Sequence, residues 1–384
     1  MPQALIAAAE THDDLPQLKA QFALAYGATD FVDFDASGAA QSGFADATIA
    51  RALRLAWDAA AKRHKLTIPD TGPVPGLFIL GLGKLGGRDL NFSSDVDLIA
   101  FYDPETLPVP VNKGQAYIAG DICKALTQIL MPRHSPDFVW RVDWRLRPES
   151  SGTGLAMAVD KAESFYFFRA LPWHRLAMMK ARVVAGDTEA GATFLDALQP
   201  FIWRRNLDFS TLQELATLKT RINNEHPGLE FERAAPDPIT PEASGFNLKL
   251  GRGGIREIEF IANAQQLIRG GKLPSLRTSH TRTALSELAE AGLMPAEDAE
   301  QLREIYADFR RIENAVQMLE NAQTHIIPTE PTRREQLMGV LGITDWDATC
   351  AKFFAQRQYV NTRFDALFAQ AEASEEAPLD IAGL

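Results

Sequence analysis

The sequence LFILGLGKLGGRDLNFSSDVDLIAFYD, residues 77–103, decides the fold because two short apolar runs enclose a polar turn rich in glycine. The runs Leu77–Leu80 and Leu98–Phe101 have the length and composition of buried strands. Asp95 and Asp97 precede the second run, and residues two apart on a strand point to the same face of a sheet. The stretch therefore predicts two carboxylates beside a turn whose backbone can bind phosphate, as in a divalent-metal site for phosphoryl or nucleotidyl transfer.

The same turn also matches a dinucleotide-binding fingerprint. Gly81, Gly83 and Gly86 fit the pattern G-x-G-x-x-G, and Asp103 lies 22 residues after Gly81. That fold needs an amphipathic helix after the glycines, but residues 86–94 contain two glycines and few helix formers. A Rossmann fold that binds NAD is therefore the weaker alternative.

Composition limits the class of protein. The 384 residues carry 39 basic and 50 acidic side chains, a net charge of −11 that argues against general nucleic-acid binding. There is no apolar run of about 18 residues and no signal-peptide pattern, so we expect no membrane partner. The two cysteines, Cys123 and Cys350, have no metal-binding or redox spacing and are expected to be packing residues. These features predict a cytoplasmic protein.

Outside the central stretch the apolar periodicity is mainly helical, which predicts an α+β protein. The expected regions are a helical N-terminal region at 1–70, an α+β domain at 71–205, a helical domain at 206–373 and an acidic tail at 374–384. The expected helices are 48–64, 113–131, 160–182 with a break at Pro172, 188–203, 208–225, 254–269, 279–292, 296–322, 331–341 and 345–372. Stretches rich in proline and glycine predict loops at 67–76, 104–111 and 227–245.

The segment Phe138–Pro148 alternates between charged and apolar residues, which predicts a strand. One face would carry Val139, Arg141, Asp143, Arg145 and Arg147, and the other Trp140, Val142, Trp144 and Leu146. Asp143 then becomes a third carboxylate, and three carboxylates on two neighbouring strands would hold one or two Mg²⁺ ions. The alternative is that Asp143 only forms a salt bridge with a neighbouring arginine on the same face.

Cations and hydroxyls near these carboxylates are candidate phosphate contacts. Lys84 lies in the glycine turn, and Arg145 and Arg147 can bind phosphate through two parallel hydrogen bonds. Ser93 and Ser94 could bind phosphate through hydroxyl and backbone N–H groups, or serve only as turn residues.

Three further features are weaker signals. The turn and helix start at Gly251–Phe260 could bind an anion through backbone N–H groups, and Glu257 and Glu259 are spaced so that at most one lines a site. His325 is expected to be structural. The aromatic run Phe165–Phe168 is expected to pack in the core.

Together these motifs resemble the glutamine synthetase adenylyltransferase/adenylyl-removing enzymes, a family of the nucleotidyltransferase superfamily. The motifs occur in the family's order at residues 81–97, 141–148, 173–187, 249–260 and 323–328. The resemblance implies a nucleotidyltransferase-like mixed β-sheet with helices, followed by a mainly helical bundle domain. One departure is His174, at a position where the family usually has an acid.

The resemblance also implies roles for individual residues. Catalytic metal ligands would be Asp95, Asp97 and Asp143, holding Mg²⁺ or alternatively Mn²⁺. The nucleotide and phosphate contacts would be Lys84, Gly86, Gly87, Ser94, Arg145 and Arg147. The small substrates would be phosphate and ADP, or ATP.

The family enzyme has two homologous halves, and this chain is long enough for one. The sequences GGIREIEF and QTHIIP resemble the half that removes AMP from a tyrosine of glutamine synthetase. The implied partners are glutamine synthetase and a PII-type signalling protein. Two alternatives stay open: the chain attaches AMP from ATP, or it is a non-catalytic half that docks one of these partners.

Overall fold

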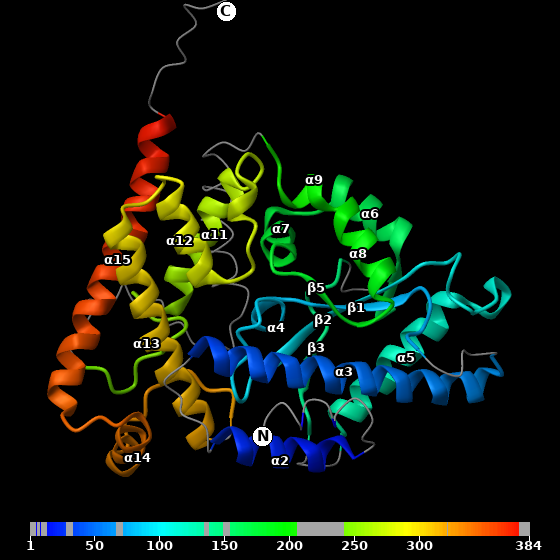
Figure 1. The fold of residues 1–384 in the computed structure, drawn as a ribbon, viewed down its shortest axis with the longest axis horizontal. Coiled ribbons are helices and arrows are strands. Elements are labelled where there is room, and N and C mark those ends of the chain that lie inside the picture. The colour runs from blue at the N-terminus through cyan, green and yellow to red at the C-terminus, as the bar shows by residue number, and fades with distance from the viewer. Residues whose placement is uncertain are drawn as a thin grey trace, which may run out of the picture. The chain divides into compact units, whose positions relative to one another are not determined.

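The computed structural model describes residues 14–27, 34–66, 72–133, 138–148, 154–205, 242–320 and 322–375, together with Leu5 and Ala8. The chain divides into two compact units, Met1–Ile202 and Trp203–Leu384. The first combines a sheet with helices and the second is helical (Figure 1). The helix expected at 208–225, most of the loop expected at 227–245 and the end of the acidic tail lie outside the described residues.

The first unit is built on a five-stranded mixed sheet. Its strands are β1 (Leu77–Gly81), β2 (Asp95–Tyr102), β3 (Arg141–Asp143), β4 (Ala156–Ala158) and β5 (Arg182–Gly186). The order is β3-β2-β1-β5, and β4 also pairs with β2. β1 is antiparallel to β2 and β5, whereas β3 and β4 run parallel to β2. The predicted mixed sheet is confirmed.

The pairing of β1 with β2 decides between the two interpretations of the glycine turn. The strands are antiparallel neighbours, and only the short helix α4 (Gly83–Gly86) lies in the connection between them. A dinucleotide-binding unit needs parallel strands joined through a long helix. The Rossmann alternative is therefore wrong.

Helices cover both faces of this sheet (Figure 1). They are α2 (Leu15–Gly27), α3 (Phe34–His64), α5 (Gln115–Leu130), α6 (Val159–Phe168), α7 (Pro172–Met178), α8 (Thr188–Ala197) and α9 (Gln199–Ile202), with a 3-10 turn at Val111–Lys113. Two tryptophans that flank β3 anchor it to α3 and α5. The Trp140 indole N–H donates to Thr48 Oγ1 at 2.9 Å, and that of Trp144 donates to Thr127 Oγ1 at 3.0 Å.

The opposite face of the sheet packs against α8. The Phe101 ring lies 4.6 Å from that of Phe194 on α8, measured between centroids. Phe101 has the same strand parity as Asp95 and Asp97, so the carboxylates lie on the α8 face, at the opposite end of β2. The sheet thus presents its acidic residues where a strand begins, away from the aromatic core.

The segment at 138–148 is a shorter strand than predicted. Only Arg141–Asp143 form β3, and the chain then turns because the Asp143 carboxylate accepts the backbone N–H of Arg145 at 2.7 Å. The expected helix at 160–182 is three elements instead, since α7 begins at Pro172 as expected but β5 begins at Arg182. The strands β4 and β5 were not predicted.

The aromatic run in α6 is only partly buried. Phe165 and Tyr166 are 6% and 2% exposed, but Phe167 and Phe168 are 41% and 86% exposed. Four consecutive helical residues point around the whole helix, so they cannot all face one core. The prediction of core packing is therefore wrong for Phe167 and Phe168.

The second unit consists of helices, as predicted. These are α11 (Ile255–Arg269), α12 (Thr281–Glu290), α13 (Ala296–Glu320), α14 (Pro331–Leu341) and α15 (Trp346–Glu375), with a 3-10 turn at Pro274–Leu276. Both cysteines are free thiols: Cys123 is buried, and burial raises its pKa to about 12, while Cys350 is half-buried. None of the described helices is both long and apolar enough to cross a membrane.

Lys19 on α2 is an unusual cation in the first unit. Its Nζ is buried, lies 3.5 Å from the centroid of the Trp140 ring, and has no hydrogen-bond acceptor within the described residues. Burial, reinforced by the charge of Arg141, lowers the pKa of Lys19 from 10.5 to about 7. The folded state therefore disfavours the protonated amine, although attraction to the Trp140 ring offsets part of the cost.

We expect Lys19→Met to stabilise the protein by about 2–4 kcal/mol at pH 6.5. Between the folded pKa near 7 and the unfolded pKa of 10.5 the unfolded chain binds the extra proton, so the stability of the wild type rises with pH across this window. The advantage of the variant should consequently shrink towards pH 10. Urea unfolding at both pH values measures it, with Lys62→Met on an exposed position as the control. A gain that does not change with pH would contradict the argument.

Candidate functional site

Three carboxylates occupy adjacent positions on one face of the sheet. In the parallel ladder of β2 and β3, Asp95 pairs with Arg141 and Asp97 pairs with Asp143. Paired residues in a ladder share a face, as do residues two apart on one strand. The strand register therefore brings Asp95, Asp97 and Asp143 to the same edge of the α8 face.

The glycine turn lies directly against the central carboxylate. A Cβ atom added to Gly83 would stand 2.7 Å from Asp97 Oδ2, and Gly83 has a φ of +53°. The backbone N–H of Leu82 donates to the Asp97 carbonyl at 3.0 Å, which ties the turn to β2. Only glycine combines this backbone conformation with so close an approach.

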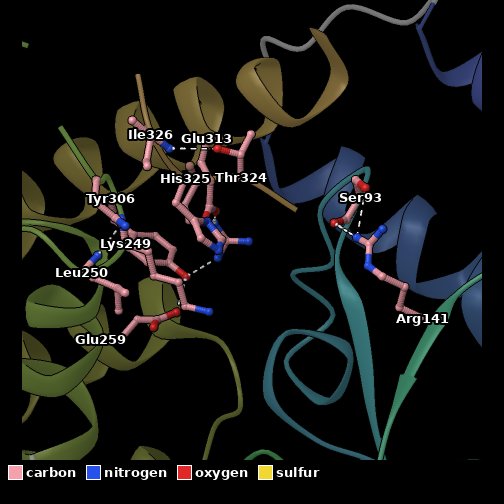
Figure 2. A network of polar contacts seen from close by, with 12 residues as sticks. Ser93, Arg141, Lys249, Leu250, Glu259, Tyr306, Glu313, Thr324, His325 and Ile326 are labelled. Carbon is pink, nitrogen blue, oxygen red and sulfur yellow. Dashed lines mark hydrogen bonds and ion pairs between the residues drawn. The ribbon is translucent and has the colours of Figure 1, made fainter. Parts of the chain in front are cut away.

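Two of the carboxylates are paired with arginines. Asp95 Oδ1 lies 2.7 Å from Arg141 Nε, and the same guanidinium donates to the carbonyl and hydroxyl oxygens of Ser93 (Figure 2). Asp143 Oδ2 accepts from Nε and a terminal nitrogen of Arg145 at 2.8 and 2.5 Å. Burial acts to raise the pKa of Asp143, but the hydrogen bonds and charge of Arg145, helped by the charge of Arg147, hold it below its usual value.

The chemistry of these donors fits a divalent cation, although their present positions favour the arginines. Carboxylate oxygens are the ligands that Mg²⁺ and Mn²⁺ prefer. Within the ranges that the structure describes, no three acidic, histidine or cysteine side chains converge as a ready-made metal centre. Asp95 and Asp143 are instead turned towards guanidinium groups, which neutralise them.

The predicted phosphate contacts lie in and near the same turn. Gly86 and Gly87 donate their N–H groups to the carbonyls of Leu82 and Gly83, so these two donors are already used within the turn. Gly86 also packs closely, since a Cβ there would lie 2.0 Å from the Lys180 carbonyl oxygen. Lys84 is half-buried in α4, and Ser94 is buried just before β2. Arg147 donates from its guanidinium to the Trp144 carbonyl at 2.8 Å.

In the second unit the glycine-rich turn before α11 is closed to anions. Gly253 N–H donates to Glu257 Oε2 at 3.0 Å, Gly254 N–H to the Gly251 carbonyl and Ile255 N–H to the Leu248 carbonyl. To bind an anion these three N–H groups would have to be free, but all of them donate to acceptors within the turn and α11. The expected anion site is therefore wrong. The turn instead packs closely against α15: a Cβ on Gly253 would stand 2.3 Å from a carbonyl oxygen of that helix.

A buried polar network, which the sequence did not reveal, joins α11, α13 and the segment that follows α13 (Figure 2). Glu313 on α13 contacts His325 Nδ1 at 2.6 Å and Arg310 Nε at 3.1 Å, and the side chains of Glu313 and Arg310 have no exposed surface. Arg310 also donates to Tyr306 Oη at 2.6 Å, and Tyr306 donates to Glu259 at 3.2 Å. His325 is therefore structural, as expected.

Known proteins match both parts of this chain. Residues 6–197, half of the chain, match the family described as glutamate-ammonia ligase adenylyltransferase. The chain belongs to this family. Residues 230–368 also match a family described as GlnD PII-uridylyltransferase. The resemblance found in the sequence, and with it membership of a family of adenylyl-transferring enzymes, is confirmed.

The relatives of this chain within the adenylyltransferase family are much longer proteins. One from Caulobacter vibrioides is 42% identical over 347 residues, which are 89% of this chain and 34% of the relative. Those from Mesorhizobium japonicum and Xanthobacter autotrophicus are 39% and 36% identical, over 86% and 94% of this chain and 33% and 36% of the relatives. All three are named bifunctional glutamine synthetase adenylyltransferase/adenylyl-removing enzyme. The chain thus spans about a third of their length.

The residue that departs from the pattern expected of this adenylyltransferase family has a structural role. His174 is buried, and burial lowers its pKa to about 4. Its Nδ1 accepts the Leu171 N–H at 3.0 Å, and its ring stacks on Trp173 at 3.6 Å. His174 therefore caps the start of α7 as a neutral imidazole at pH 7.

Proposed function

We propose that this chain removes AMP from the adenylylated tyrosine of glutamine synthetase, with inorganic phosphate as the acceptor, and so regulates nitrogen assimilation. The observation that carries the proposal is the register of β2 and β3, which sets Asp95, Asp97 and Asp143 on one face beside the glycine turn. Membership of the adenylyltransferase family supports the chemistry, and the names of the relatives supply the protein substrate.

In the proposed reaction an oxygen of hydrogen phosphate attacks the AMP phosphorus, and the bond from that phosphorus to the tyrosine oxygen breaks. The proton of hydrogen phosphate passes to the leaving oxygen, so the products are ADP and unmodified tyrosine, without a covalent enzyme intermediate. A Mg²⁺ or Mn²⁺ ion held by Asp95, Asp97 and Asp143 would neutralise charge on the phosphate oxygens and polarise the phosphorus.

Other side chains of the site would bind and orient the phosphates. We assign phosphate contacts to Lys84, Arg145 and Arg147. The charges of Arg145 and Arg147 act on Asp143, and Lys84 follows Gly83 in the turn. Gly86, Gly87 and Ser94 shape the turn that faces these groups. Because the N–H groups of both glycines are used internally, their contribution is the close packing that fixes Gly83 against Asp97.

The opposite direction, attachment of AMP from ATP, is the second candidate. The observation that favours it is the description of the matching family as an adenylyltransferase, and the relatives carry both activities in their name. The same carboxylates would serve either direction, because both displace an oxygen at the same phosphorus.

Two assays on the purified chain separate these candidates. The first supplies adenylylated glutamine synthetase and phosphate and measures ADP; the second supplies unmodified glutamine synthetase and ATP labelled at the α-phosphorus and measures labelled protein. The proposal predicts ADP in the first assay and only background label in the second. Label without ADP would establish the alternative, and neither product would indicate a non-catalytic half that docks its partners.

A PII-type signalling protein is a further proposed partner. Its support is the match of residues 230–368 to a family described as PII-uridylyltransferase. Calorimetric titration of the chain with a PII protein tests this, and the absence of measurable heat over a range of temperatures would remove the proposal.

We expect Gly83→Ala to lower the rate of AMP transfer by about 10–10²-fold, because the new methyl group must displace the Asp97 carboxylate. The variant should also lose about 1–2 kcal/mol of stability, since its φ of +53° disfavours a side chain. Gly72→Ala is the matched control: Gly72 has a φ of +92° but nothing within 4 Å of the added Cβ. Equal losses of activity in both variants would show that backbone strain, and not the carboxylate, limits the rate.

A further inference from the structure

The two arginines beside the carboxylates are held in different ways. Arg141 is fixed: its guanidinium contacts both oxygens of Ser93 (Figure 2). It also contacts Asp95 and lies over the Phe138 ring, and its side chain is only 26% exposed. Arg145 is 75% exposed. Among the described residues, its guanidinium hydrogen-bonds to Asp143 alone.

Arg145 nevertheless lies in the electric field of the whole site. Its hydrogen bonds to Asp143 are the main cause that raises the pKa of Arg145, and the charges of Asp97 and Asp95 raise it further. The exposed Arg145 guanidinium is thus the counter-ion of Asp143 and lies near the other two carboxylates. Asp143 Oδ1 already accepts the backbone N–H of Arg145, so Oδ2, the atom that the Arg145 guanidinium contacts, is the oxygen left for a divalent cation.

A divalent cation and Arg145 would compete for the same oxygen. The cation carries the larger charge and prefers carboxylate oxygens, whereas an exposed arginine–carboxylate pair has little net stability. Arg141 is harder to displace from Asp95. If it moved away, Ser93 and the half-buried Arg141 guanidinium would lose their present hydrogen bonds. Arg145 is therefore the group that is displaced.

We propose that Arg145 is an exchangeable counter-ion, which releases Asp143 when the divalent cation binds and then moves its guanidinium onto a phosphate oxygen of the substrate. This inference rests on the proposed function. The exchange keeps Asp143 paired with a positive charge before and after the cation binds. It also frees the planar Arg145 guanidinium, which is suited to bind phosphate, only when the cation is bound.

The first test observes Arg145 directly by ¹H–¹⁵N spectroscopy of arginine Nε–H groups during a Mg²⁺ titration of the full chain. The Arg145 signal is identified by its loss in Arg145→Gln, and the Arg141 signal by its loss in Arg141→Gln. We expect the Arg145 signal to shift towards that of a solvated guanidinium, while the Arg141 signal stays in place. An Arg145 signal that does not move at Mg²⁺ saturation overturns the exchange.

The second test measures the competition by calorimetric titration with Mn²⁺. Arg145→Gln should bind Mn²⁺ about two- to fivefold more tightly than the wild type, because the competing pair is gone. Arg63→Gln breaks another exposed arginine–aspartate pair, at 2.7 Å to Asp121, and should leave the affinity unchanged. With Mn²⁺ bound, Arg145→Gln should bind ADP more weakly than the wild type.

The results of these tests distinguish a failure of the exchange from a failure of the proposed function. If the wild type binds neither Mg²⁺ nor Mn²⁺, the metal site of the proposed function fails and the exchange fails with it. If the wild type binds metal, but Arg145→Gln binds it no more tightly and the Arg145 signal stays fixed, only the exchange is overturned.

Discussion

Asp97→Asn is expected to lower AMP transfer by at least about 10²–10³-fold while the protein folds as before. Asp97 is central to the site: it pairs in register with Asp143, shares a strand face with Asp95 and lies against Gly83. Asparagine keeps the shape of the side chain but removes the charge and one oxygen able to bind a cation. The rate is measured in the assay that shows activity for the wild type, and the fold by circular dichroism and thermal unfolding.

Asp103→Asn is the matched control at the other end of the same hairpin. The Asp103 carboxylate accepts the Glu105 N–H at 2.9 Å and the Thr106 hydroxyl at 2.9 Å, so it organises a turn. This variant should keep the activity of the wild type and lose about 1 kcal/mol of stability at most. Activity of Asp97→Asn within tenfold of the wild type would remove the carboxylate site as the centre of the reaction.

The sequence was sufficient to predict that the carboxylates share one face of the sheet, because its signals are local. Asp95 and Asp97 share a face by the two-residue period of a strand, and the glycines between β1 and β2 exclude a long helix. The helices α11 to α15 carry apolar periodicity over ten or more residues, so their existence was predictable. Membership of the family followed from the order of the motifs and did not need the three-dimensional arrangement.

The short strands could not be predicted from local pattern. β5 is a strand because Arg182–Gly186 pair with β1, about a hundred residues earlier, and five residues carry too little periodicity to reveal this. β3 ends early because Asp143 bonds to the Arg145 N–H, although the alternation of the sequence continues beyond it. The pairing of Asp143 with Arg145, weighed as an alternative to metal binding, is present in the structure, and the proposed exchange between arginine and cation starts from it.

Glu313→Gln is expected to destabilise the second unit by about 3–5 kcal/mol, the cost typical of removing one partner of a buried ion pair. Glu313 and Arg310 have no exposed side-chain surface, and Glu313 also accepts from His325. The neutral amide removes the anion that now contacts the buried Arg310 guanidinium. The variant should show this loss in the helix that holds both residues.

Hydrogen exchange of the α13 amides is the suitable measurement, because a global unfolding curve would combine the two units. The loss corresponds to exchange that is about 140- to 4,000-fold faster, since every 1.4 kcal/mol is roughly a factor of ten. Glu320→Gln on the same helix is the control: Glu320 lies 3.7 Å from Arg333, and both side chains are partly exposed. Its expected cost is below about 1 kcal/mol.

A double variant decides whether the buried charge is the cause. Glu313→Gln combined with Arg310→Met removes both charges, and it should recover most of the protection lost in Glu313→Gln alone, because an uncharged pair carries no uncompensated cation. Tyr306 would lose the hydrogen bond from Arg310 but keep the one that it donates to Glu259. If the double variant exchanges as fast as Glu313→Gln, the loss comes from the broken contact with His325, and the ion pair contributes little to the stability of the unit.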